Sequence, residues 1–238
     1  MPAQPIIALD FDGVINCSFD QTSNPDWTSF VLINVDDHAI NPIDTEDGQQ
    51  LTKVEALSLI AVADGRYGTG TSDKMLNVLT RQGLEDGPFY TRHHSDDPQH
   101  EFFAPGRIGA PTIITYHPQH VEFIHQLLAD EVPIMWATSW ESAILPVARI
   151  IGLPEMPVLK LGECAGPLLH SATSVDWKLS AIGNAIPRQP VIWIDDVASG
   201  QARDNISVVA TNSRLGLDKE AQQQTHDLIR NLREGARK

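Results

Sequence analysis

The sequence predicts an α/β fold: a parallel sheet flanked by helices, with an inserted cap-like segment. Short apolar runs, which are typical of strands buried on both faces, alternate along the chain with segments of helical periodicity. This alternation indicates parallel strands joined by right-handed crossovers. Residues 17–110 are the exception, because they are rich in Asp, Asn, Gly, Thr and Pro and have weaker periodicity. We therefore expect an insertion there.

Three apolar runs are the expected strands of the core sheet. They lie at Ile6–Leu9, Val132–Trp140 and Gln189–Asp196, and each has about the length of a strand. Each run also stops at side chains that carry oxygen. Ligands of such sheets bind beyond the carboxyl ends of the strands, so we expect the three polar ends to share one crevice.

Helices are expected after the insertion and between the later strands. The segment 117–130 has one apolar face, and the segment 141–152 is the next helix, with Gly152 as its stop. A third helix follows Ser174, which suits an N-cap position. An amphipathic helix over residues 217–234 closes the chain.

The predicted domain organisation is one core domain, residues 1–16 and 111–238, interrupted by residues 17–110. A structureless segment of that length is uncommon inside a compact protein. We therefore expect the insertion to be a small cap over the crevice, with an extended loop segment as the alternative.

Inside the insertion, the local patterns are weak. Residues 28–35 (TSFVLINV) are compatible with a strand, and residues 72–83 are compatible with a capped helix. The Gly-rich stretch 64–73 and the polar stretch 91–101 are typical of loops.

Composition excludes several classes of protein. The formal net charge of −14 opposes general binding to nucleic acids or to anionic membranes. The two cysteines, Cys17 and Cys164, are too few for a disulfide framework. No basic leader and no long uncharged apolar run is present, so we expect a cytoplasmic protein with no membrane partner.

The acidic side chains at two of the strand ends predict a metal site. Asp10 and Asp12 follow the first run directly, and Asp195 and Asp196 end the third. Carboxylates this close repel one another unless a cation or a proton lies between them. An all-oxygen ligand set favours Mg²⁺. Taken singly, each pair could be an ordinary turn or a solvated loop, but such turns do not explain three polar strand ends.

These features together resemble the haloacid dehalogenase (HAD) superfamily of phosphotransferases. The likeness rests on the stretch 10–14 (DFDGV), a Thr ending the second run, a Lys, and the acidic pair ending the third run. It covers residues 5–16 and 112–217 and implies a Rossmann-like, HAD-type core. The stretches WATSWE, GLP and WIDD are similar to HAD domains found in bacterial and phage RNA-repair proteins.

The resemblance implies a role for each polar strand end. It makes Asp10 the nucleophile and Asp12 the general acid and base. The phosphoryl group would be bound by Thr138, with help from Ser139, and by the Lys178 ammonium, for which Lys160 is the alternative. The implied Mg²⁺ ligands are Asp10, Asp12, Asp195 and Asp196.

The implied function is Mg²⁺-dependent hydrolysis of a small phosphate ester or a nucleotide-like end group through an aspartyl-phosphate. Members of the superfamily that cleave carbon–halogen bonds lack the second aspartate, so Asp12 favours phosphate chemistry. The alternative is a catalytically silent module that binds a phosphorylated ligand.

Overall fold

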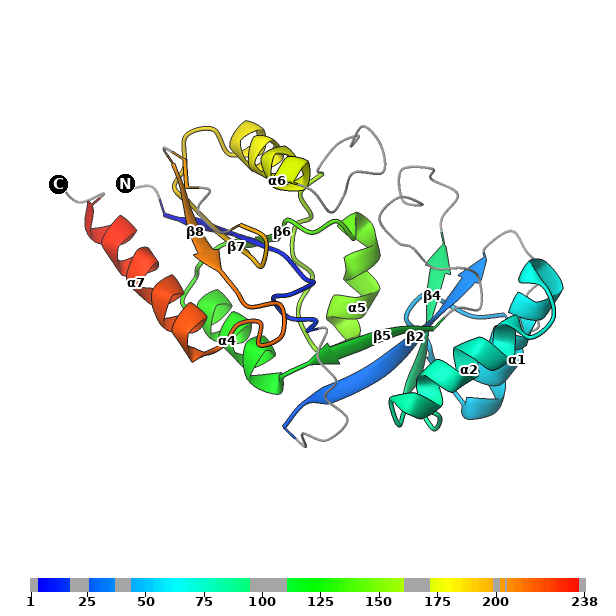
Figure 1. Ribbon diagram of the computed structural model, residues 1–238. Coiled ribbons are helices and arrows are strands. Elements are labelled where there is room, and N and C mark those ends of the chain that lie inside the picture. The colour runs from blue at the N-terminus through cyan, green and yellow to red at the C-terminus, as the bar shows by residue number, and fades with distance from the viewer. Residues whose placement is uncertain are drawn as a thin grey trace. The chain divides into compact units, whose positions relative to one another are not determined.

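The computed structural model describes residues 4–17, 26–36, 44–94, 111–160, 172–198, 202–203 and 205–235. The chain divides into two compact units (Figure 1). Unit 1 comprises Met1–Phe19 and His117–Lys238, and unit 2 comprises Asp20–Tyr116.

Unit 1 contains a four-stranded parallel sheet, which confirms the predicted α/β class and is consistent with a Rossmann-like fold. Its strands are β1 (Ile6–Leu9), β6 (Ile134–Trp136), β7 (Val191–Asp195) and β8 (Ile206–Ala210). They lie in the order β6-β1-β7-β8. All three neighbouring pairs are parallel.

The helices of unit 1 follow the sheet strands in the predicted alternation. They are α4 (Pro118–Ala129), the 3₁₀ turn η1 (Glu141–Ala143), α5 (Ile144–Ile150), α6 (Ala172–Ala185) and α7 (Lys219–Gly235). In Figure 1, α6 lies on one side of the sheet, whereas α4 and α7 lie on the other. Leu179 and Ile182 of α6 pack against Val191 and Trp193 of β7 in a buried cluster.

Two predicted boundaries in unit 1 were wrong. Strand β6 ends at Trp136, so residues 137–140 form a turn rather than the end of a strand. Helix α6 begins at Ala172, which places Ser174 inside the helix instead of at its N-cap.

The order of the strands creates a topological switch point at the carboxyl end of β1. Ile7 pairs with Ile134 of β6 on one side and with Ile192 of β7 on the other. The chain therefore passes from β1 to its neighbour on one side, β6, and then crosses over β1 to its neighbour on the other side, β7. Such a reversal of direction is where open parallel sheets bind their ligands. It lies directly before Asp10.

Unit 2 has its own mixed sheet, in the order β3-β4-β2-β5. The strands are β2 (Thr28–Asp36), β3 (Gln50–Leu51), β4 (Phe89–His94) and β5 (Pro111–Tyr116). Strands β2 and β4 are parallel, and the other two pairs are antiparallel. Helices α1 (Lys53–Tyr67) and α2 (Thr71–Arg81) share a buried core with one face of the sheet.

The expected strand at residues 28–35 and the helix near residues 72–83 are both present in unit 2, but other expectations for this region were wrong. Residues 111–116 were assigned to the core domain, whereas they form β5, which pairs with β2. Residues 64–67 end helix α1, and residues 91–94 belong to β4; neither stretch is a loop. Among the described residues, no helix has both the length and the apolar character needed to cross a bilayer.

Candidate active site

The ends of three neighbouring strands deliver the polar side chains to one edge of the unit 1 sheet. Asp10 follows β1, Thr138 lies two residues beyond β6, and Asp195 is the last residue of β7. Because the strands are parallel and adjacent, their carboxyl ends coincide, as the sequence predicted.

A tight turn after β1 fixes the backbone between Asp10 and Asp12. The Phe11 carbonyl oxygen accepts hydrogen bonds from the N–H groups of Ile15 and Asn16, both at 2.9 Å. The Phe11 ring is fully buried, with its neighbours Trp136 and Trp140 at edge-to-face angles. The two aspartates thus flank an anchored aromatic side chain.

Gly13 is required by the close approach of Asp196. Its φ is +70°, and a Cβ there would lie 2.2 Å from the Asp196 Cγ atom. The Gly13 carbonyl oxygen accepts a hydrogen bond of 2.8 Å from the Thr211 hydroxyl beyond β8. The turn after β1 therefore packs closely against the segment that follows β7 and is hydrogen-bonded to the segment that follows β8.

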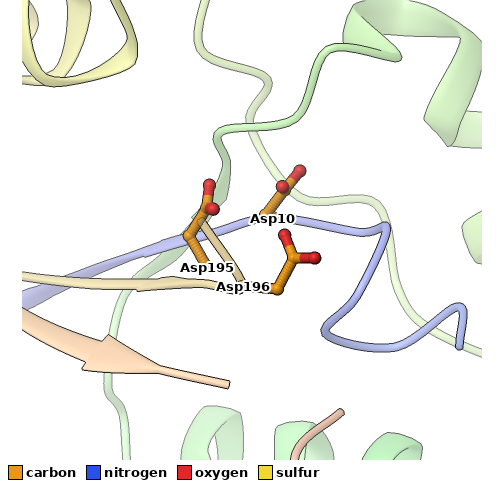
Figure 2. Close-up of side chains that lie close together, drawn as sticks. All are labelled: Asp10, Asp195 and Asp196. Atoms are coloured by element: carbon orange, nitrogen blue, oxygen red, sulfur yellow. The ribbon is translucent and has the colours of Figure 1, made fainter. Parts of the chain in front are cut away.

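Asp10, Asp195 and Asp196 form a carboxylate cluster (Figure 2). One oxygen from each side chain lies within 4.8 Å of the others, so the three could hold a metal ion. Asp10 and Asp195 are buried, and Asp196 is partly exposed. Three of the four predicted metal ligands are therefore brought together.

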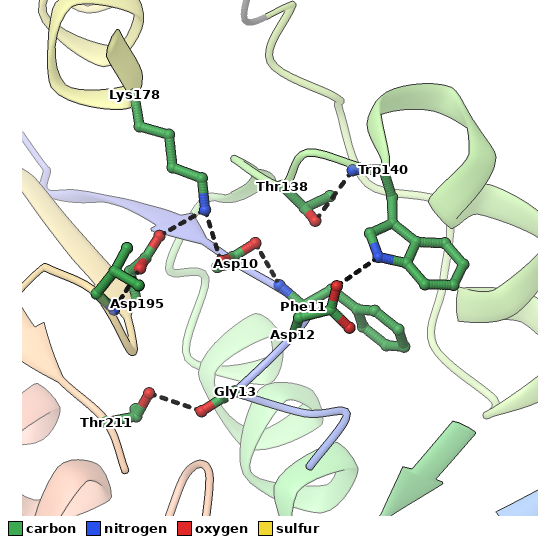
Figure 3. A network of polar contacts seen from close by, with 10 residues as sticks. Asp10, Phe11, Asp12, Gly13, Thr138, Trp140, Lys178, Asp195 and Thr211 are labelled. Carbon is green, nitrogen blue, oxygen red and sulfur yellow. Dashed lines mark hydrogen bonds and ion pairs between the residues drawn. The ribbon is translucent and has the colours of Figure 1, made fainter. Parts of the chain in front are cut away.

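The Lys178 ammonium joins two members of this carboxylate cluster (Figure 3). Its Nζ atom lies 2.6 Å from Asp10 Oδ2 and 2.7 Å from Asp195 Oδ2. Burial opposes the charge on Lys178, but the two carboxylates outweigh this effect and its pKa is raised. The lysine comes from α6, as the sequence predicted, whereas the alternative, Lys160, is exposed.

The second aspartate of the turn, Asp12, is not a member of the carboxylate cluster. Its Oδ2 accepts a hydrogen bond of 2.7 Å from Trp140 Nε1, and its Oδ1 accepts one of 2.7 Å from Asn16 Nδ2. Asp12 is exposed to solvent at its surface, but the many protein atoms around its carboxylate dehydrate it, and this raises its pKa despite both hydrogen bonds.

The acidic side chains at the end of β7 also have raised pKa values. Burial, followed by the charge of Asp10, raises the pKa of Asp195 to about 7. The same two causes raise the pKa of Asp196. Proximity of carboxylates in a dehydrated site thus penalises their ionised forms, and a bound cation would remove this penalty.

The predicted phosphoryl-binding hydroxyls lie in the turn that follows β6. Thr138 is fully buried, and its Oγ1 accepts a hydrogen bond of 3.3 Å from the Trp140 backbone N–H. Ser139 follows it and is half-buried. Thr138 is thus part of the same turn that supplies Trp140.

The charge balance and the donor atoms of this site fit a hard divalent cation. Three carboxylates, those of Asp10, Asp195 and Asp196, gather near one ammonium group, so acidic groups outnumber basic ones in this largely buried cluster. The members of the carboxylate cluster offer only oxygen atoms, the ligands that Mg²⁺ and Ca²⁺ prefer.

Sequence reasoning missed three side chains that shape the site: Asn16, Trp140 and Thr211. Each contacts the 10–13 turn through a polar group. Asn16 lies four residues beyond Asp12, so its position near the turn could have been inferred. The partners Trp140 and Thr211 are distant in sequence, and no local pattern identifies them.

The chain was compared with protein-family models, with curated proteins and with solved structures, and none of these comparisons gave a match.

Proposed function

We propose that this protein is a HAD-type, Mg²⁺-dependent phosphohydrolase that acts on a small phosphate ester or a nucleotide-like end group through an aspartyl-phosphate. The observation that carries the proposal is the placement of Asp10. Its carboxylate is fixed at a strand end, bonded to Lys178 at 2.6 Å and adjacent to two further carboxylates, with Asp12 one turn away.

The first chemical step would be attack on the substrate by Asp10. One carboxylate oxygen forms a bond to phosphorus, and the bond from phosphorus to the leaving oxygen breaks with its electron pair. Asp12, in its protonated form, transfers its proton to that oxygen. The products of this step are the free alcohol, the aspartyl-phosphate and the Asp12 carboxylate.

The second step would return the enzyme to its starting state. The Asp12 carboxylate takes a proton from a water molecule while the water oxygen bonds to phosphorus. The bond from phosphorus to the Asp10 oxygen breaks, which releases inorganic phosphate and regenerates the carboxylate. Asp12 is protonated again and ready for the next substrate.

The remaining side chains would stabilise charge around the phosphoryl group. Lys178 would neutralise an equatorial oxygen, and the Thr138 and Ser139 hydroxyls would donate hydrogen bonds to the others. A Mg²⁺ ion held by Asp10, Asp195 and Asp196 would offset the repulsion between the anionic nucleophile and the anionic substrate.

The decisive test is release of inorganic phosphate from a panel of phosphate monoesters, with Mg²⁺ and with a chelator. We expect turnover only with the metal. Asp10→Asn should lower activity by more than a hundredfold, because the amide cannot form the phosphoenzyme but hardly changes the side-chain volume. The matched control is Asp176→Asn, the same substitution at an exposed position of α6.

A binding measurement separates an enzyme from a silent module. Beryllofluoride with Mg²⁺ mimics a phosphoryl group on Asp10 and should raise the melting temperature above that with Mg²⁺ alone. Ligand at a hundredfold excess over its dissociation constant stabilises a protein by about 2.7 kcal/mol. Stabilisation without turnover would favour the binding module, and the absence of both would refute either function.

A further inference from the structure

Both carboxylate oxygens of Asp12 are held by side-chain donors. Trp140 Nε1–H bonds to Oδ2, and Asn16 Nδ2–H bonds to Oδ1, each at 2.7 Å (Figure 3 shows the Trp140 bond). Two donors on opposite oxygens determine the plane in which the carboxyl group lies. Rotation of Asp12 about its last side-chain bond would break at least one of these bonds.

The Trp140 indole is itself fixed in place. Trp140 is only 6% exposed, and its ring meets the Phe11 ring at 73° with 5.3 Å between centroids. Its backbone N–H is bonded to the Thr138 hydroxyl. Since Phe11 stands between Asp10 and Asp12 in the chain, the indole is anchored to the same turn whose carboxylate it contacts.

We propose that Trp140 is a positioning residue that aims the Asp12 carboxyl group at the leaving oxygen of the substrate. This inference rests on the proposed function, because it assigns Asp12 the proton that the leaving group takes up. Proton transfer requires heavy atoms within hydrogen-bond reach, and a misplacement of 1 Å can cost on the order of a hundredfold in rate. A rigid indole donor keeps Asp12 within that reach.

The competing interpretation is that Trp140 only packs against Phe11 in the hydrophobic core and does not position Asp12. The two roles differ in how the loss of the indole N–H affects substrates with different leaving groups. A phenolate made weakly basic by a nitro group departs with little help from an acid, whereas unsubstituted phenolate needs its proton. Loss of packing would lower both rates alike.

The experiment compares kcat/KM of wild type and Trp140→Phe with Mg²⁺ on a series of para-substituted phenyl phosphates, from nitro to unsubstituted. The phenyl rings of these substrates are nearly equal in shape, and kcat/KM includes the step in which the leaving group departs. We expect the variant to lose roughly ten- to a hundredfold more on phenyl phosphate than on p-nitrophenyl phosphate. The dependence of rate on leaving-group basicity should therefore steepen.

Trp136→Phe is the matched control. Trp136 is fully buried, and its ring also meets the Phe11 ring edge-on, with 6.2 Å between the ring centroids. Unlike Trp140, its Nε1 has no hydrogen-bond partner among the described residues. The same substitution there changes packing without removing a donor to Asp12. Its dependence on leaving-group basicity should match that of wild type.

Two further variants keep the result decisive. Asn16→Ala removes the donor to the other oxygen at a half-buried position, so it tests the positioning of Asp12 even if Trp140→Phe folds poorly. It should steepen the same dependence. In an Asp12→Asn background, Trp140→Phe should add no further steepening, because the two residues act through one group.

The outcomes separate the two levels of inference. A wild-type protein inactive toward every ester with Mg²⁺ would refute the proposed function and this role with it. An active wild type, with parallel losses across the series in both Trp140→Phe and Asn16→Ala, would overturn the positioning role alone.

Discussion

Lys178 is the residue on which the charge balance of the site depends. Its ammonium is buried between Asp10 and Asp195, and removing one partner of a buried ion pair leaves the other charges uncompensated. Lys178→Met should therefore lower the free energy of unfolding by about 3–5 kcal/mol in the absence of metal. Urea denaturation measures this loss.

The matched control for that variant is Lys53→Met. Lys53 also bonds a carboxylate at 2.6 Å, but both partners, Lys53 and Asp86, are largely exposed. Lys53→Met should lower the free energy of unfolding by about 1 kcal/mol or less. Equal losses in the two variants would show that burial does not strengthen the dependence on Lys178.

Asp196 and Asp195 should differ in their response to substitution by asparagine. Asp196 is partly exposed and makes no hydrogen bond to Lys178 in the described part of the chain, whereas Asp195 is fully buried and bonded to it. Asp196→Asn should raise the Mg²⁺ concentration needed for half-maximal activity with little change in stability. Asp195→Asn should raise this Mg²⁺ concentration and, in addition, lower the midpoint of urea unfolding. An unchanged Mg²⁺ requirement in Asp196→Asn would contradict its role as a ligand.

The sequence predicted the convergence of Asp10, Asp195 and Asp196, because acidic residues at the ends of apolar runs share one sheet edge. It did not predict that Asp12 turns toward Trp140, 128 positions away. Hydrophobic periodicity reports which face of an element is buried, but not which distant donor a polar side chain meets.

At the scale of elements, the strongly apolar strands of unit 1 and most of the helices were predicted, but several elements were missed, among them β8 and α1. Strand β8 is short and only partly buried, so it resembles a loop in sequence. Helix α1 contains a Gly and has a weakly segregated apolar face, which conceals its periodicity. Its start, however, carries a recognisable T-x-x-E signal at Thr52 and Glu55.

This capping box predicts a measurable effect on α1. The Thr52 hydroxyl accepts a hydrogen bond from the Glu55 N–H, and the Glu55 carboxylate accepts one of 2.8 Å from the Thr52 N–H. Thr52→Ala should cost about 1 kcal/mol of stability, measured by denaturant unfolding. Ser58→Ala removes a hydroxyl that bonds only the preceding turn, and it should change stability by less than about 0.5 kcal/mol.

For the whole molecule, sequence composition and periodicity predicted an interrupted α/β chain, and the structure divides it near the expected boundaries. The return boundary was misplaced because no strand was predicted at Pro111–Tyr116, and only the pairing of this segment with β2 assigns it to unit 2. Pairing partners are a property of the tertiary fold, so no local sequence pattern could assign this segment to unit 2.

The stability of the whole protein should depend on pH through His120. Burial, assisted by the charge of His117, lowers the pKa of His120 to about 4. The unfolded chain therefore binds a proton near pH 6.5 that the folded protein does not bind until about pH 4. As the pH falls through this interval, the folded state should lose up to about 3 kcal/mol.

Urea unfolding at pH 7 and at pH 4.5 tests this dependence. His120→Gln should lose less stability between the two pH values than wild type does. His125→Gln, on the exposed side of the same helix, controls for the loss of a histidine in general. If wild type and His120→Gln lost the same free energy of unfolding between pH 7 and pH 4.5, other groups would be the cause of the acid sensitivity.

The central position of β1 has a consequence for how the protein folds as it is made. Ile7 pairs with Ile134 and Ile192, so β1 is synthesised long before either neighbour. Unit 2 is continuous in sequence and complete once Tyr116 has left the ribosome. Its folding brings the flanking segments closer together and shortens the effective loop that β1 must close. Because Thr28 pairs with Tyr116, we expect early folding of unit 2 to favour closure of the sheet in unit 1.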